Sequence, residues 1–169
     1  MWNNTDIPLA YLITFRCYGT WLHGDERGSI DRDNNQYQTP YLPPNKALEE
    51  LNMSSLKSKP VSLSIFQRTL VESAIREVCE HRKWALFAIN VRTNHIHTVV
   101  RIGENNPHRA LNDFKSYATR KLRKHNGWNF EHSPWSDRGS ERYLWNERSV
   151  EIAVDYVING QGSELPKFE

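Results

Sequence analysis

Residues 84–102 read WALFAINVRTNHIHTVVRI, and this stretch decides the fold. Both of its halves are rich in apolar and β-branched residues, which favour strands. The three residues between the halves, Arg92-Thr93-Asn94, are typical of a tight hairpin connection. We therefore predict two neighbouring antiparallel strands, over Trp84–Val91 and over Asn94–Ile102.

The second predicted strand carries two histidines, His95 and His97, on either side of Ile96. Side chains alternate along a strand, so both imidazoles should point to one face while Ile96 enters the core. Two imidazoles on one face can share a divalent metal ion. In a chain with 7 histidines a chance His-x-His arises roughly 0.3 times, so the pair needs a supporting context. The alternative is structural: one histidine caps the strand end and the other forms a surface hydrogen bond.

Further elements are predicted outside the hairpin from apolar spacing and strand-forming composition. They are strands over Leu9–Cys17 and Tyr143–Asn146, helices over about 62–83, 108–124 and 149–158, and a polar loop over 126–142. The resulting order is β-α-β-β-α-β followed by a C-terminal helix. The predicted fold class is therefore α+β, a ferredoxin-like split βαβ arrangement with an antiparallel sheet and both of its helices on one face.

A chain of 169 residues is near the common size of one domain, and we predict a single domain over 1–169. Residues 18–61, rich in Gly, Asp, Asn and Pro, read as a long irregular insertion after the first strand. Residues 148–160 are predicted to form the extra C-terminal helix. Loops as long as this insertion are usually functional or mobile.

The composition indicates a cytoplasmic protein with no membrane span. Cys17 and Cys79 lie far apart and form no CxxC pair, so neither a disulfide framework nor a zinc knuckle is indicated. The N-terminal residues lack the basic and apolar regions of a signal peptide. No run approaches eighteen consecutive apolar residues, the length that a transmembrane helix requires.

The predicted helix over 108–124 carries one tyrosine and a concentration of basic residues. Tyr117 lies at the edge of the apolar stripe, where a ring usually packs and leaves its hydroxyl in water. Six basic residues and one acidic residue, Asp113, lie between Arg109 and Lys124, although the net charge of the whole chain is only +2. Some of these cations complement the helix dipole. Their concentration beside a candidate metal site also favours a phosphodiester partner, so we expect nucleic acid.

Three segments together resemble a known family, the small single-tyrosine transposases of insertion-sequence type. NVRTNHIHTVVRI resembles the HUH motif, in which two histidines around a bulky apolar residue bind a divalent cation. FKSYATRKL resembles the helix that carries the family's nucleophilic tyrosine. YLWNERSVEIAVDYVINGQG is similar to a segment typical of the REP-associated tyrosine transposase branch. The resemblance covers about residues 9–17 and 62–160.

The resemblance implies cleavage and joining of single-stranded DNA that contains a hairpin. Mg²⁺ or Mn²⁺ held by His95 and His97 would polarise the scissile phosphate, and no organic cofactor is expected. The Tyr117 phenolate would attack phosphorus, which gives a 5′-phosphotyrosine intermediate and a free 3′-hydroxyl. The branch resemblance also implies a monomer rather than a homodimer, associated with the nucleoid when bound to DNA. Expected DNA contacts are Arg92, Arg101, Lys115, Arg120, Lys121, Arg123 and Lys124.

The family's third metal ligand, often Gln or Asn one turn after the tyrosine, is replaced by Lys121 on this reading. A protonated lysine cannot bind a metal ion. Asp113, one turn before Tyr117, is the ligand we expect instead. The alternatives are His23 or Asp25 from the His23–Gly28 run, or a Lys121 that supplies charge to the phosphate. The His23–Gly28 run itself is either a lid that contacts DNA or a solvated turn.

Two other functions remain open from the sequence. A domesticated protein that binds a nucleic-acid hairpin without cutting it is favoured by Lys121 at the expected ligand position. A hydrolase of some other phosphodiester is disfavoured because the chain lacks the carboxylate cluster that two-metal sites usually need.

Overall fold

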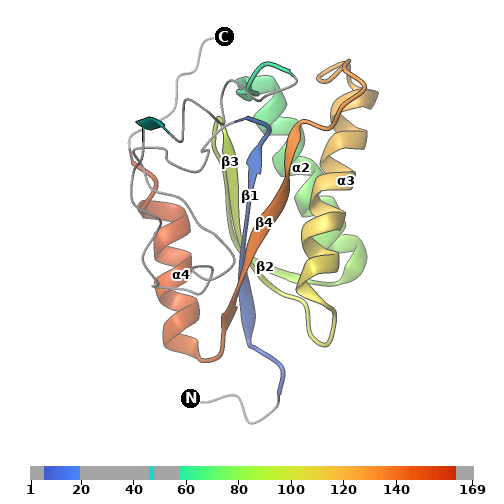
Figure 1. Cartoon of the computed structure of the whole chain (residues 1–169). Helices are drawn as coiled ribbons and strands as arrows, with labels where there is room; N and C mark the ends of the chain where they lie inside the picture. The colour runs from blue at the N-terminus through green and yellow to red at the C-terminus, as the bar shows by residue number, and fades with distance from the viewer. Residues whose placement is uncertain (1–5, 20–45, 48–57, 163–169) are drawn as a thin grey trace.

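A four-stranded antiparallel sheet separates two layers of helices. The computed structural model describes residues 6–19, 46–47 and 58–162 (Figure 1). The sheet has the order β2-β3-β1-β4. The elements are β1 (Ala10–Cys17), α2 (Ile65–Arg82), β2 (Ala85–Val91), β3 (His95–Arg101), α3 (Pro107–Lys124), β4 (Trp135–Leu144) and α4 (Glu147–Asn159). This order confirms the predicted split βαβ fold with an additional C-terminal helix.

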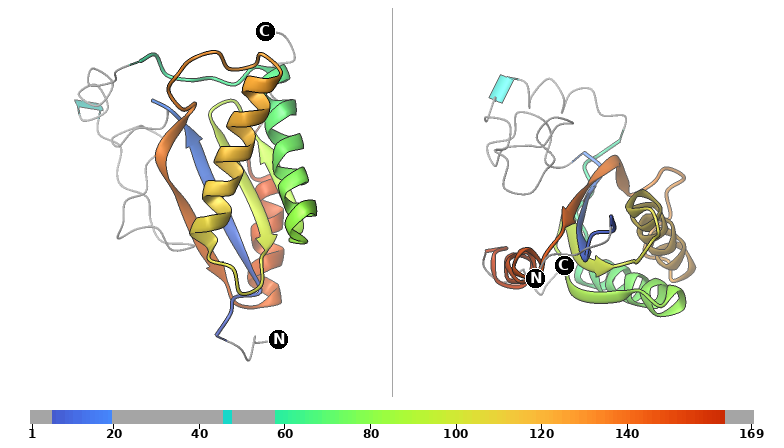
Figure 2. Two further views of the ribbon diagram at one scale, coloured as in Figure 1. Left: turned by 90° about the vertical axis from the view of Figure 1, so that its right-hand side faces the viewer. Right: turned by 90° about the horizontal axis from the view of Figure 1, so that it is seen from below.

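Helices α2 and α3 lie side by side on one face of the sheet, and α4 lies on the other (Figures 1 and 2). Local sequence signals begin both helices of the first layer. Ser64 and Gln67 form a reciprocal capping box at the start of α2. The Asn106 side chain caps α3, and Pro107 occupies its first turn. The helix boundaries therefore follow from polar residues that satisfy the free backbone N–H groups.

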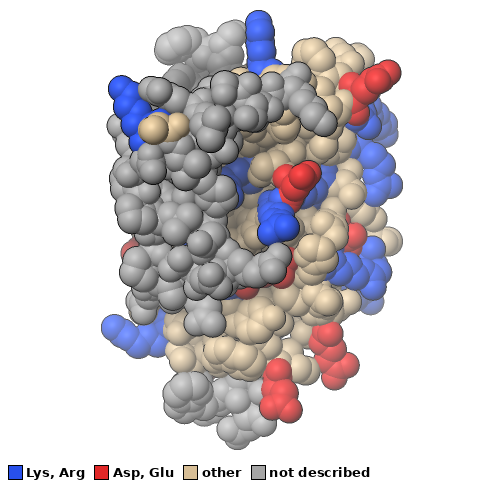
Figure 3. All heavy atoms as spheres, viewed as in Figure 1, with Lys and Arg blue, Asp and Glu red and all other residues tan. Residues whose placement is uncertain are grey.

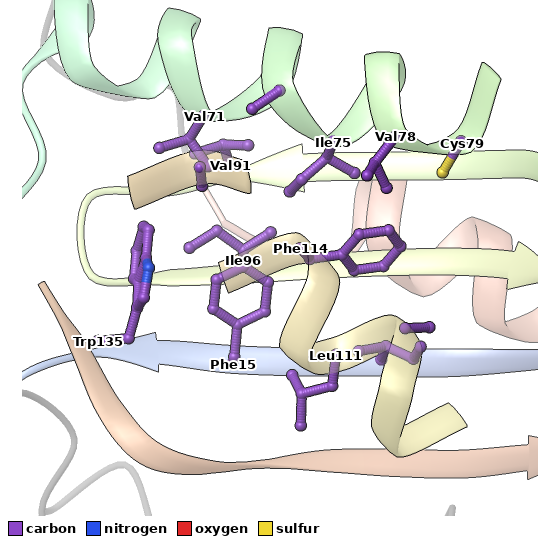
Figure 4. Close-up of a cluster of buried hydrophobic side chains, with 14 of the residues drawn as sticks. Phe15, Val71, Ile75, Val78, Cys79, Val91, Ile96, Leu111, Phe114 and Trp135 are labelled. Atoms are coloured by element: carbon purple, nitrogen blue, oxygen red, sulfur yellow. The ribbon is translucent and has the colours of Figure 1, made fainter. Parts of the chain in front are cut away.

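The main hydrophobic core fills the space between the sheet and the α2/α3 layer (Figure 4). Phe15 of β1 and Ile96 of β3 are fully buried there. The Phe15 ring packs edge-on against Trp135, with ring centroids 5.1 Å apart. Phe114 of α3 enters the same core. Because Ile96 points into this layer, its neighbours on β3 point to the opposite face.

A second, smaller core lies between the opposite face of the sheet and α4. Leu12 and Val99 contribute from the central strands, and Ala153 and Val157 contribute from α4. The Asn90 side chain adds a 2.9 Å hydrogen bond to the carbonyl of Val157. The C-terminal helix is therefore packed on the face toward which the side chains next to Ile96 project.

Strand β4 is longer than the sequence predicts. Residues 126–142 were expected to form a polar loop, yet β4 begins at Trp135 and pairs along nearly all of β1, with a register shift near Cys17. The physical reason is its edge position. Among the described strands β4 pairs with β1 alone, so polar side chains along it can project into water, and its composition gives no apolar run.

Both cysteines are free and buried, as the sequence suggested. Burial raises the pKa of the Cys17 and Cys79 thiols to about 12, which keeps them protonated.

Gly139 on β4 allows α3 to approach the sheet closely. A methyl group added at this glycine would lie 2.6 Å from the carbonyl oxygen of Thr14 and 2.9 Å from the Leu111 side chain. We expect Gly139→Ala to lower the free energy of unfolding by about 1–3 kcal/mol because of this overpacking. Denaturant unfolding monitored by tryptophan fluorescence measures the difference.

Ser140→Ala is the matched control on the adjacent residue. The buried Ser140 hydroxyl has no hydrogen-bond partner within the described ranges, so its removal should change stability by less than about 0.5 kcal/mol or increase it. A Gly139→Ala protein as stable as the control would contradict the close packing of α3 on β4.

Candidate functional site

His95 and His97 lie together at the beginning of β3, on the face covered by α4. Their ring centroids are 4.7 Å apart. Asn94 Oδ1 lies 2.6 Å from Nδ1 of His95, and Thr14 Oγ1 lies 2.7 Å from Nδ1 of His97. An Nδ1–H that donates to such an oxygen fixes the tautomer in which Nε2 carries the lone pair. Both imidazoles are thereby oriented so that Nε2 can act as a ligand atom.

His97 is held neutral by its surroundings. Its side chain is 3% exposed. Burial, followed by the charge of His95, lowers the pKa of His97 to about 3, and a hydrogen bond with the nearby Gln161 amide acts in the opposite direction. Its buried Nε2 makes no hydrogen bond of acceptable geometry within the part of the chain that the structure describes. A buried, neutral imidazole nitrogen without a partner is well suited to bind a cation.

The end of α4 brings two further polar side chains to the histidines. The Tyr156 ring packs edge-on against His97, with centroids 5.3 Å apart. Gln161, just beyond the helix, donates from its amide nitrogen to the Tyr156 carbonyl at 2.9 Å. This bond turns the amide oxygen of Gln161 toward His95, and Oε1 lies 3.3 Å from Nε2 of that ring.

His95 thus has an acceptor oxygen beside each ring nitrogen, from Asn94 on one side and Gln161 on the other. A neutral imidazole has only one N–H and cannot donate to both oxygens. When Nδ1 carries the proton, the Nε2 lone pair faces the Gln161 oxygen, which is a repulsive contact. A cation bound by both atoms would remove the repulsion, so the residues present fit a divalent metal ion.

Tyr117 lies in the other helical layer. Its ring packs against the main core between the sheet and α2/α3, and the Arg120 guanidinium carbon lies 4.4 Å from its centroid. The sheet separates this position from His95 and His97. The expected juxtaposition of Tyr117 with the histidines is therefore wrong, because the apolar stripe of α3 packs on the same face as Ile96.

The proposed replacement ligand also lies in the α2/α3 layer. Asp113 forms an ion pair with Arg82 at 3.2 Å. The Lys121 ammonium bonds to Ser73 at 2.8 Å and to the Glu77 carboxylate. Neither Asp113 nor Lys121 is on the histidine face, so the expectation that Asp113 joins His95 and His97 is corrected.

The His23–Gly28 run, with His23 and Asp25, lies outside the described residues. Elsewhere, over 6–19, 46–47 and 58–162, no group of three or more His, Cys, Asp or Glu side chains could hold a metal ion. A site here must accordingly include another kind of ligand, such as the Gln161 amide.

Several of the expected DNA-contacting cations have partners within the protein. Lys115 donates to the carbonyls of Ser136 and Arg138 at 2.9 and 3.0 Å, and burial lowers its pKa to about 8. Arg101 lies over the Phe87 ring at 5.3 Å. Burial, and then the charge of Arg68, lowers the pKa of Arg92. Basic side chains also gather along the side of the molecule formed by α3 (Figure 3).

One sequence signal could have found Tyr156 and Gln161. The stripe of the helix at 108–124 and Ile96 must share the main core, so the histidines must face away from that helix. Among the predicted helices, this leaves the C-terminal helix to cover their face, and its tyrosine is Tyr156. Gln161 follows five residues later, one residue beyond the place where the family pattern has Gln or Asn.

The chain is similar to known transposases in its family-model match and in its fold. The model of the IS200-like transposase family matches residues 59–157. A REP-associated tyrosine transposase bound to a REP hairpin has the same fold at 15% identity and a TM-score of 0.51, covering 93% of this chain and 69% of that chain. A candidate transposase from Deinococcus radiodurans R1 is 10% identical with a TM-score of 0.49, covering 95% and 97%. No curated protein sequence matches significantly.

None of the helices in the described ranges has the length and apolar character needed to cross a bilayer. The family match spans more than half of the chain and includes both histidines and Tyr156. This chain belongs to the IS200-like transposase family.

Proposed function

We propose that this transposase cleaves and rejoins single-stranded DNA with Tyr156 as the nucleophile. The observation that carries the proposal is the position of Tyr156 against His97, with Gln161 beside His95. A hairpin-containing substrate is proposed because the REP-associated structure of the same fold is bound to one.

Nε2 of His95, Nε2 of His97 and Oε1 of Gln161 would hold the metal ion. Imidazole nitrogen and amide oxygen are suitable ligands for Mn²⁺, and for Mg²⁺ when water and substrate phosphate complete its shell. When bound, this cation would polarise the scissile phosphate and stabilise the charge that develops on it. Thr14 and Asn94 would keep both rings in the ligating tautomer.

Tyr156 would carry out the covalent step. Its phenol proton leaves to water, the Tyr156 Oη–P bond forms, and the P–O3′ bond breaks as the 3′ oxygen takes up a proton. The products are a 5′-phosphotyrosine and a free 3′-hydroxyl. Attack by another 3′-hydroxyl reverses the step and joins two strands without ATP, because the phosphodiester energy is kept in the covalent link.

The alternative function, hairpin binding without cleavage, rested on Lys121, and the structure removes this argument. Lys121 suggested this alternative because it stood at the expected ligand position. In the structure Lys121 pairs with Glu77 in the α2/α3 layer, away from the histidines. It therefore gives no argument against metal binding or cleavage.

Replacement of either tyrosine tests the nucleophile. With Mn²⁺ and a pool of hairpin oligonucleotides with randomised single-stranded flanks, we expect wild type and Tyr117→Phe to form a covalent protein–DNA adduct. Tyr156→Phe should form none, because it lacks the attacking oxygen. Denaturing gel electrophoresis detects the adduct. Loss of the adduct in Tyr117→Phe, with retention in Tyr156→Phe, would refute the assignment.

Calorimetric titration with Mn²⁺ tests the ligand set. His97→Ala should abolish binding, and Gln161→Ala should weaken it by at least about tenfold because a ligand is lost. Asp113→Asn and Lys121→Met are the controls and should bind Mn²⁺ as wild type does. The ligand set is wrong if Asp113→Asn weakens binding while Gln161→Ala leaves it unchanged.

Thr14→Val tests the orientation of His97. Valine keeps the shape of threonine but cannot accept from Nδ1, so the ring loses the bond that selects its tautomer. We expect Mn²⁺ affinity to fall by about tenfold to a hundredfold. Thr98→Val is the control, because Thr98 bonds to the Ile13 carbonyl and lies on the other face of β3. Equal Mn²⁺ affinities of the two variants would argue against the role of Thr14.

A further inference from the structure

The segment between α3 and β4 carries a cluster of aromatic rings. Phe130 lies against Trp128 with centroids 5.0 Å apart and against His132 at 5.6 Å. Trp128 and His132 are themselves perpendicular at 5.3 Å. His132 continues the cluster to Tyr18, 5.7 Å away, just after β1. We call Trp128, Phe130 and His132 the aromatic loop.

Hydrogen bonds hold the aromatic loop in one conformation. Trp128 Nε1 donates to the His132 carbonyl at 2.8 Å and closes the loop on itself. The Arg123 guanidinium donates to the carbonyls of Phe130 and Glu131 at 3.2 and 2.9 Å. Gln67 of α2 donates to the carbonyl of Gly127 at 2.7 Å, which ties the loop to the neighbouring helix.

The two large rings of the loop differ in exposure. Trp128 is 6% exposed and anchors the loop in the main core. Phe130 is 61% exposed, although its backbone and one side of its ring are fixed by the neighbouring groups. A large apolar ring fixed in this way presents a preformed surface to a ligand, which loses little conformational entropy on binding.

The aromatic loop lies at the same end of the sheet as the histidines. Tyr18 N–H donates to the Pro134 carbonyl, and Cys17 N–H donates to the carbonyl of Asn94, which precedes His95. Figure 1 shows that β1 and α3 both end there, next to the segment that leads into β4. A strand of DNA at the site could therefore pass over this end of the sheet and reach Phe130.

We propose that Phe130 is a stacking platform for an unpaired base of the single-stranded DNA. This inference rests on the proposed function, because it assigns part of the same substrate. Every nucleobase has a π-face that can stack on an aromatic ring, whereas the bases of a duplex are already stacked on one another. Arg123, bonded to the Phe130 carbonyl, adds positive charge to the loop, but the carboxylate of Glu131 offsets it. The contact therefore depends on the ring rather than on charge.

Fluorescence anisotropy with labelled oligothymidylate in EDTA tests the platform without metal or cleavage. We expect Phe130→Ala to weaken binding by about 5- to 100-fold, the usual range for loss of one stacked base. Phe130→Trp should bind at least as tightly as wild type. Binding of a duplex of equal length should be the same for wild type and both variants.

Phe87→Ala is the matched control, because Phe87 is also an exposed phenylalanine but lies on β2, outside the aromatic loop. It should bind oligothymidylate as wild type does, and the thermal unfolding of all variants should be compared. Quenching of 2-aminopurine in the oligonucleotide should accompany binding to wild type and be lost in Phe130→Ala.

The proposal is overturned if Phe130→Ala binds oligothymidylate as tightly as wild type, if duplex binding falls equally, or if wild type does not bind. The result of the Tyr156 adduct assay does not depend on any of these binding results. A protein that binds through Phe130 but forms no adduct would refute only the cleavage chemistry.

Discussion

The alternation of side chains along β3 is the constraint on which both the fold and the site depend. Ile96 is fully buried between the sheet and α2/α3, and this burial fixes which face of β3 is turned to the main core. His95 and His97 must then face α4. A shift of the strand by one residue would bury two imidazoles in an apolar core and expose Ile96, which is strongly disfavoured. The packing that stabilises the domain therefore also positions the metal ligands.

Helix α4 and the residues just beyond it add Tyr156 and Gln161 to the two histidines of β3. Ala153 and Val157 are its buried apolar contacts with the sheet, Val150 and Val154 pack beside them, and its last turn lies over the imidazoles. Tyr156 reaches His97 from the helix, while Gln161 reaches His95 from the residues just beyond it. The bond from Gln161 to the Tyr156 carbonyl links these two groups. The candidate site is thus formed by a central strand and by the end of α4, the helix that covers its face in the described part of the chain.

Much of the fold follows from local sequence signals, but part of the site depends on tertiary packing. The hairpin and helices α2 and α3 have apolar periodicity and capping residues that can be read directly. β4 could not be read in full, because an edge strand with polar side chains resembles a loop. Tyr117 matches the sequence context expected of the nucleophile, whereas Tyr156 lies in a segment for which only a closing helix is predicted. Choosing between them required knowing which face of the sheet each helix covers, a fact that periodicity within either helix does not contain.

The two helical layers place different constraints on the side chains of this chain. Residues that pack between the sheet and α2/α3 need only preserve volume and apolar character, and compensating changes can accumulate there. Residues on the α4 face must preserve particular atoms in particular positions. Side chains of α2 and α3 that do not touch β3 share few contacts with α4, so substitutions in these helices and in α4 should have nearly additive effects on stability. The apolar layer can therefore tolerate a change of side chain that the α4 face, with its particular ligand atoms, cannot.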